Sequence, residues 1–185
     1  MLRAVTNRDF PMLAQALRDL FSIELDFDPA LGALARQSVW TLSARGDRDP
    51  QGRIRILFIG GTEDLSRGWL RDRDVIGRNF GWLRLVQVAE PEEFDFTSEG
   101  CAYVPRTRDG YLLAVTLHEI YEVLTGDTHH CENPGRCVNS ECSVARGGYC
   151  CLCMGGLIDE KWPDLRLEDL YCEEDLAELR EALGR

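Results

Sequence analysis

The sequence predicts a mixed α/β (α+β) fold with a twisted mixed sheet, one prominent helix and a cysteine-rich C-terminal segment. Three observations support this prediction. Short stretches with the alternation of β-strands lie between longer stretches with helical periodicity. A helical stretch near residue 118 carries a histidine and two glutamates. Seven of the eight cysteines follow it, between Cys131 and Cys172.

The N-terminal part of the chain predicts a helix, a strand and a second helix. Residues 10–21 have apolar side chains at helical spacing, and Pro11 suits the first turn of a helix. Residues 23–27 alternate as a short strand does. Residues 31–42 are then expected to form a helix.

The next part predicts the centre of the sheet. Residues 46–52 are polar and rich in turn-forming residues, which indicates a surface loop. Residues 53–59 alternate in polarity and end at two glycines, so they are expected to form a central strand. Residues 79–88 are expected to form either a pair of strands or one long strand.

Two further helices flank a long irregular stretch. Residues 112–124 predict a helix whose start is marked by Asp109 and Gly110. Residues 126–156 show little periodicity and many Cys, Gly, Asn and Ser residues, so a bound metal is expected to organise them. Residues 173–183 predict a charged amphipathic helix.

Length and charge limit the classes of function. A chain of 185 residues suits one domain, with residues 1–125 forming the sheet and the metal-binding helix and residues 126–185 forming the cysteine-rich tail. Its 21 basic and 32 acidic residues give a net charge of -11, which argues against a nucleic-acid partner. No apolar run reaches the roughly 20 residues of a membrane span, and the N-terminus is charged where a signal peptide would be apolar. A cytoplasmic protein without a membrane partner is expected.

All three histidines lie within residues 118–130, which predicts a metal site on the helix. Side chains four residues apart share a helix face, so His118 and Glu122 are expected to bind one ion, with Glu119 beside its water. Gly126 would turn the chain and bring either His129 or His130 back as a third ligand. The plainer alternative is an exposed polar helix face followed by a capped loop.

The clustered cysteines predict a structural zinc site. In a reducing compartment, clustered thiols hold metal more often than they form disulfides. Their spacings suit a tetrahedral ion, whereas Cys101 stands apart and is expected to be a plain buried thiol. The clustered residues are Cys131, Cys137, Cys142, Cys150, Cys151, Cys153 and Cys172.

The order of these features resembles the archaemetzincins, a branch of the metzincin zinc peptidases with the pattern HExxHxxGxxHC and a cysteine-rich tail that binds a second zinc. The positions that carry the resemblance are His118, Glu119, Gly126, His129 or His130, and Cys131. The resemblance implies a zincin-like fold, two Zn²⁺ ions and a peptide or protein substrate. It also implies that Glu119 is the catalytic base and that Met154 belongs to a methionine turn.

Within the tail, the resemblance supports Cys131, Cys153 and Cys172 as zinc ligands, with Cys137 or Cys150 as the fourth. The chain departs from the pattern at two places. Glu122 replaces the second histidine of HExxH, and the closing pair of cysteines is reduced to Cys172.

Two classes of function follow. One is a cytoplasmic zinc peptidase whose hydrolysis is slow, because an anionic ligand makes the zinc a weaker Lewis acid. The other is a catalytically silent zinc protein of the same fold, acting as a binding module. A nucleic-acid-binding zinc finger lacks the required basic face, and a disulfide-rich secreted domain lacks a signal peptide.

Overall fold

The computed structural model describes residues 2–35, 42, 45–60, 77–90, 104–126, 151–171 and 173–184. The chain divides into two compact units, Met1–Glu93 and Phe94–Arg185. The expectation that residues 1–185 form a single domain stays a prediction. Among the described residues, no helix is both long enough and apolar enough to cross a membrane.

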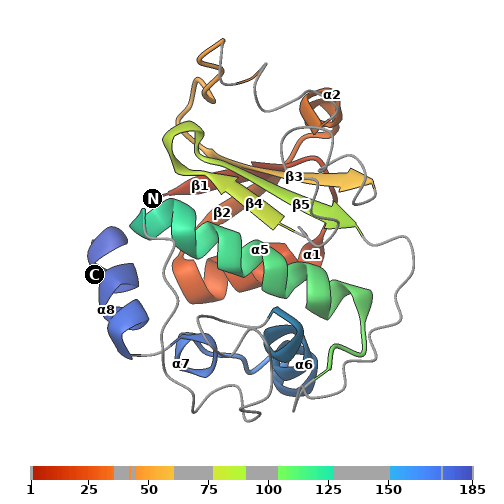
Figure 1. The fold of residues 1–185 in the computed structure, drawn as a ribbon, viewed down its shortest axis with the longest axis vertical. Helices are drawn as coiled ribbons and strands as arrows, with labels where there is room; N and C mark the ends of the chain where they lie inside the picture. The colour runs from red at the N-terminus through yellow and green to blue at the C-terminus, as the bar shows by residue number, and fades with distance from the viewer. Residues whose placement is uncertain are drawn as a thin grey trace. The chain divides into compact units, whose positions relative to one another are not determined.

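The first unit contains a five-stranded mixed sheet with the strand order β2-β1-β3-β5-β4, which confirms the predicted fold class (Figure 1). Of the described strands, β2, β1, β3 and β5 run parallel to one another, and β4 pairs with β5 in the antiparallel direction. The strands are β1 (Arg3–Thr6), β2 (Glu24–Phe27), β3 (Ile54–Gly60), β4 (Gly77–Phe80) and β5 (Leu85–Glu90).

The strand predicted at residues 53–59 is confirmed as β3, in the centre of the sheet. Its first six residues are all buried, as expected for a strand that is covered on both faces. Residues 79–88 form the strand pair rather than one strand, because the 3-10 turn Gly81–Leu83 and the left-handed Arg84, with φ of 48°, reverse the chain. Strand β1 was not predicted from the sequence.

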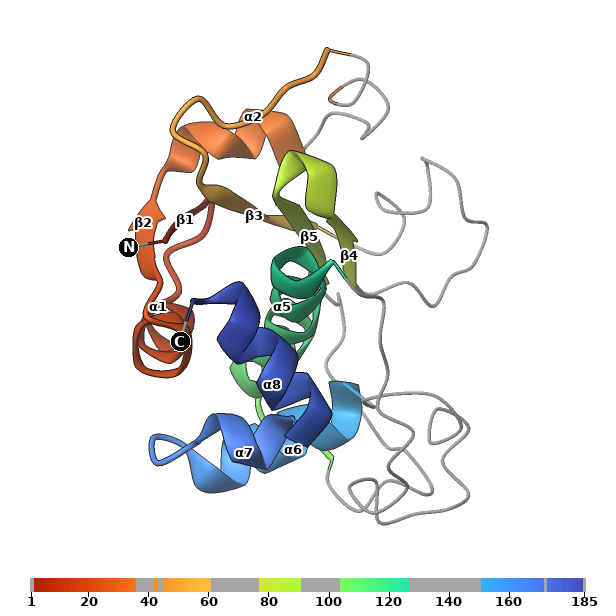
Figure 2. The ribbon, with the colours of Figure 1, turned by 90° about the vertical axis from the view of Figure 1, so that its left-hand side faces the viewer.

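Two helical segments cover opposite faces of this sheet (Figure 2). The helix predicted at residues 10–21 is confirmed as α1 (Pro11–Ala16), which continues as the π-helix Leu17–Phe21. The 3-10 turn Pro29–Leu31 leads into α2 (Gly32–Ala35), where the structure confirms the start of the second helix. On the α2 face, the buried cluster comprises Val5, Leu31, Leu42, Leu57, Leu83 and Leu85.

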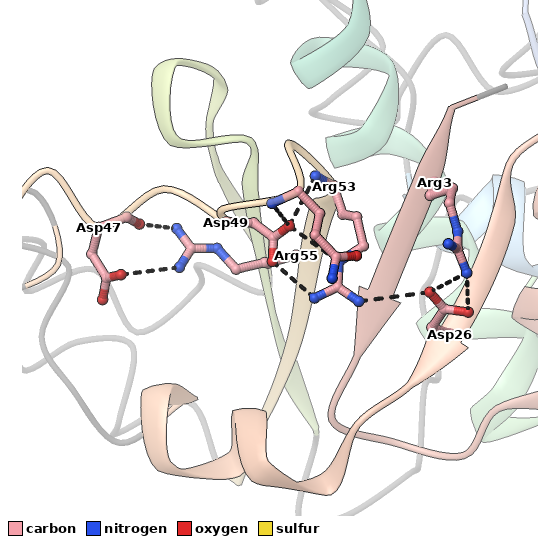
Figure 3. Close-up of polar contacts among 7 residues, drawn as sticks. Arg3, Asp26, Asp47, Asp49, Arg53 and Arg55 are labelled. Atoms are coloured by element: carbon pink, nitrogen blue, oxygen red, sulfur yellow. Dashed lines mark hydrogen bonds and ion pairs between the residues drawn. The ribbon is translucent and has the colours of Figure 1, made fainter.

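The loop before β3 is anchored by ion pairs rather than being wholly solvated (Figure 3). Asp49 is only 9% exposed and pairs with Arg53 at 2.9 Å. The bond from Arg53 holds the pKa of the Asp49 carboxyl below its ordinary value. Arg53 also approaches Asp26 on β2 at 3.6 Å, and Asp26 accepts a hydrogen bond from Arg3 on β1. Charged side chains therefore tie the loop to two strands.

The elements described in the second unit are helices. They are α5 (Arg108–Thr125), α6 (Cys151–Lys161), α7 (Leu167–Leu170) and α8 (Glu173–Ala182). Helices α6 and α8 pack against α5, and α7 packs against α8 (Figure 2). The helices predicted at residues 112–124 and 173–183 are confirmed, although α5 begins earlier.

The prediction of irregular structure through residue 156 is wrong from Cys151 onward, because α6 begins there. Gly155, which suggests a turn, instead allows two helices to approach closely. A Cβ atom on this residue would lie 3.2 Å from the Cα of Tyr111 on α5 and 3.1 Å from the Cβ of Pro105. Met154 is buried within this helix and not in a turn, which contradicts the methionine turn that the resemblance implied.

Candidate metal centre

Helix α5 has clear start and stop signals. Thr107 precedes the first helical residue, and its side-chain oxygen accepts a hydrogen bond from the backbone N–H of Gly110 at 2.9 Å. Gly126, with φ of 76°, ends the helix in the left-handed conformation that glycine adopts without strain. Between them, every residue from Gly110 to Leu117 is buried, so the helix is held largely by packing.

The structure brings three of the proposed site residues together on α5. The Nε2 atom of His118 lies 3.6 Å from the Oε1 atom of Glu122. Glu119 contributes a carboxylate, and one ligand atom from each of the three residues lies within 4.8 Å of the others. The side chains of His118 and Glu122 are 17% and 10% exposed, and Glu119 is 7% exposed. The group is therefore mostly buried but still reached by solvent at its histidine.

This donor set fits a divalent metal. Two ligand atoms of a tetrahedral zinc ion, each about 2.0–2.1 Å from it, lie about 3.3 Å apart. The 3.6 Å between His118 and Glu122 is close to that spacing. The carboxylates of Glu119 and Glu122 are close enough to repel each other where little water screens them, and a cation bound between them would replace this repulsion with attraction. One imidazole and two carboxylates also suit other divalent transition metals.

The remaining ligands proposed from the sequence are not brought into this group by the described part of the chain. Cys153 lies on α6 and is 8% exposed. The other proposed ligands and Cys101 lie outside the described residues, so their roles stay predictions. Those proposed ligands are His129, His130, Cys131, Cys137, Cys150 and Cys172.

Helix α6 holds the start of α5 through one carboxylate. The Oδ2 atom of Asp159 accepts hydrogen bonds from the backbone N–H groups of Arg106 and Thr107, at 2.6 and 2.9 Å. Its Oδ1 atom accepts one from the Thr107 hydroxyl. A negative charge here also interacts favourably with the positive end of the helix dipole. We call this arrangement the Asp159 clasp; the sequence contains no pattern that predicted it.

Tyrosine and carboxylate side chains link the other end of α5 to α8. The hydroxyl of Tyr121 donates to carboxylates of Glu178 and of Asp175, the latter at 3.3 Å. Burial and these acceptors raise the pKa of Tyr121 above its ordinary range. The hydroxyl of Tyr171 donates to the backbone carbonyl of Leu117 at 3.0 Å. Sequence reasoning missed all of these residues.

Comparison with known proteins gives one distant likeness. No protein-family model matches the chain, and a search of curated proteins finds no match. Among solved structures, the chain is similar to a zinc-dependent peptidase from Methanocorpusculum labreanum, at 13% sequence identity and a TM-score of 0.47. That similarity covers 97% of this chain and 100% of the other. It is too distant to define a family.

Proposed function

We propose that this chain is a zinc-dependent peptidase, archaemetzincin-like, whose hydrolysis of peptide bonds is slow. The observation that carries the proposal is the convergence of His118, Glu119 and Glu122 on one face of α5, with their ligand atoms within 4.8 Å. The peptidase pattern places a base directly after the first ligand, and Glu119 holds that position here.

Each residue of the helix site has its own role in this proposal. His118 and Glu122 would hold the ion, with His129 or His130 as a third ligand. A bound zinc would polarise a scissile carbonyl and lower the pKa of its water. Glu119, held at the same face, would serve as the base that takes a proton from the attacking water and gives it to the leaving amine. An anionic Glu122 in place of a neutral imidazole reduces the positive charge at the ion, which makes the water harder to deprotonate.

The presence of Glu122 in place of a neutral imidazole also favours a second function, a catalytically silent zinc-binding module. In that case the helix site holds metal for stability or for recognition of a partner, and Glu119 serves only as a further ligand. The two functions differ in one measurable property, which is whether the occupied site turns over peptide.

Replacement of Glu122 by histidine distinguishes the peptidase from the silent zinc-binding module. Glu122→His restores a neutral ligand, so cleavage of a mixed peptide library should rise above that of the native protein. Adding Glu119→Gln should abolish the gain, because glutamine cannot take up a proton. All three proteins are checked for bound metal, and Glu174→His on the exposed side of α8 serves as the matched control. Absence of hydrolysis in all three at full metal occupancy would exclude the peptidase.

We further propose that His118→Ala removes about one ion per chain and leaves the cysteine-bound zinc in place, because the two sites use different ligands. Elemental analysis of protein purified without added metal measures this. A metal count that does not change on His118→Ala would show that the helix binds no ion.

A structural zinc held by the cysteines of the tail is the second part of the proposal. Cys131→Ser combined with Cys153→Ser should remove this zinc and lower solubility, because a segment with little apolar periodicity depends on the metal to fold. Native protein that contains no zinc, yet keeps its melting temperature in the double variant, would contradict this part.

A further inference from the structure

The turn of α5 that carries the proposed ligands is contacted by the C-terminal segment on one particular side. Successive residues of a helix are rotated by about 100°. Leu117 and Tyr121 therefore lie on the side of the helix next to His118 and away from Glu119. Both are joined to the segment 171–178, through the Leu117 carbonyl and the Tyr121 hydroxyl.

Three of the four residues that make these contacts are buried, and the fourth, Glu178, is exposed. Tyr121 and Tyr171 are 3% and 2% exposed, and their rings stack with centroids 5.4 Å apart. Asp175, at 2% exposure, and Glu178 accept hydrogen bonds from the Tyr121 hydroxyl. The bonds from Tyr171 to Leu117 and from Tyr121 to Asp175 are buried, and hydrogen bonds in a weakly hydrated interior are electrostatically stronger than on the surface. We call these four residues the α8 clamp.

The position of the clamp along the helix matters because helix ends fray. His118, Glu119 and Glu122 lie in the last two turns of α5, which ends at Thr125. In an unsupported helix end, the distance between His118 and Glu122 would vary. The Tyr171 hydroxyl fixes the carbonyl directly before His118, and the Tyr121 side chain is held directly before Glu122.

We propose that Tyr121, Tyr171, Asp175 and Glu178 are positioning residues that keep His118 and Glu122 at metal-ligand spacing. None of them is itself proposed as a ligand. The inference rests on the proposed function for its consequence, which is the affinity of the helix site for metal. Its structural part, a fixed turn at residues 117–122, is independent of that function.

The test removes single hydroxyls and measures metal affinity. Tyr121→Phe and Tyr171→Phe should each raise the Kd for Zn²⁺ at the helix site about fivefold, since one hydrogen bond contributes about 1 kcal/mol. The titration uses Zn²⁺ against a chromophoric chelator, and the His118→Ala variant identifies the signal of the helix site. Glu178→Gln keeps an acceptor for Tyr121 and should retain most of the affinity, whereas Glu178→Ala should not.

Thr116→Val is the matched control. It also removes one buried hydroxyl from α5, whose bond runs to the carbonyl of Leu112 at 2.7 Å, but it leaves the clamp intact. We expect it to lower the melting temperature with little change in Kd. Equal losses of affinity in Thr116→Val and in the tyrosine variants would overturn the proposal, as would unchanged affinity in both tyrosine variants.

Amide hydrogen exchange separates this proposal from the proposed function. Tyr171→Phe should speed exchange at residues 117–122, and Thr116→Val should not. If the native helix binds no Zn²⁺, the proposed function fails, and the exchange result alone decides on the clamp. Unchanged exchange at residues 117–122 in both tyrosine variants would overturn it.

Discussion

We expect Gly110→Ala to destabilise the protein when Asp159 is present and to stabilise it when Asp159 is replaced by alanine. A Cβ atom at Gly110 would lie 2.2 Å from the Oδ1 atom and 2.7 Å from the Cγ atom of Asp159. The carboxylate would have to move by about 1 Å to restore van der Waals contact. Because Asp159 is fixed by three hydrogen bonds at the start of α5, that movement disrupts the Asp159 clasp.

The magnitude follows from what the clasp contributes. Hydrogen bonds to charged groups contribute about 1.5–3 kcal/mol each, but Asp159 is only half-buried and water replaces part of them. We expect Gly110→Ala to lower the free energy of unfolding by about 2–3 kcal/mol, and Asp159→Ala by a similar amount. In the Asp159→Ala background the obstruction is gone, so Gly110→Ala should stabilise by up to about 1 kcal/mol, as alanine exceeds glycine in a helix.

Urea unfolding of the four proteins, followed by far-UV circular dichroism, measures this cycle. Gly32→Ala at the start of α2 is the control, since a Cβ atom there meets nothing within 4 Å. That variant should be neutral or slightly stabilising. A cost of Gly110→Ala that is the same with and without Asp159 would refute the reasoning, because it would locate the obstruction elsewhere.

Three further predictions concern the sheet and the metal. The Asn7 amide donates a hydrogen bond of 2.9 Å to the backbone carbonyl of Phe58 and accepts one of 2.8 Å from its N–H, so Asn7→Ala should lower the free energy of unfolding in urea by about 1–2 kcal/mol. Asn7→Asp should lower it further, because a carboxylate repels the Phe58 carbonyl. Because the fold lowers the pKa of Asp49, the ionised carboxyl stabilises the folded state above the ordinary value of 3.8. This stabilisation is lost as pH falls through the folded-state pKa. Asp49→Asn should therefore make acid unfolding curves less steep below pH 4. A chelator that removes zinc should lower the melting temperature of the native protein more than that of the double cysteine variant.

The parts of the fold that could be predicted from the sequence are those with local periodicity. The helix α1 and the strand β3 repeat apolar residues at their own spacing over enough residues to be recognised. Strand β1, Arg3–Thr6, has the sequence Arg-Ala-Val-Thr, in which polar and apolar residues do not alternate. It forms because β2 and β3 pair with it on either side, which is a long-range effect.

Two glycines explain why helix α6 was not predicted from the sequence. Gly155 and Gly156 in sequence indicate a turn, since glycine weakens a helix by about 1 kcal/mol. In the structure, α5 passes so close that a Cβ atom on Gly155 would lie 3.2 Å from the Cα atom of Tyr111, so glycine suits this position. Close packing of two helices compensates for the weak helix propensity, and nothing local in the sequence signals a partner helix more than 25 residues away.

The candidate site was predictable only in the part that lies on one helix. The spacing of His118 and Glu122 implies a shared face, and the structure has their ligand atoms 3.6 Å apart. The residues that fix this helix come from elsewhere in the chain. Asp159 and Tyr171 are ordinary residues in sequence, and they gain their roles from hydrogen bonds that span more than 50 positions.

The charge of the site bears on why a glutamate stands at position 122. With His118, Glu122 and a third histidine as the proposed ligands, the set carries one negative charge, so it should hold a divalent cation firmly and acidify its water less than three neutral imidazoles would. Three imidazoles, as in Glu122→His, would do the reverse. Glu122→His should therefore weaken zinc binding while it speeds hydrolysis. A change of both properties in the same direction would mean that geometry, and not ligand charge, governs the site.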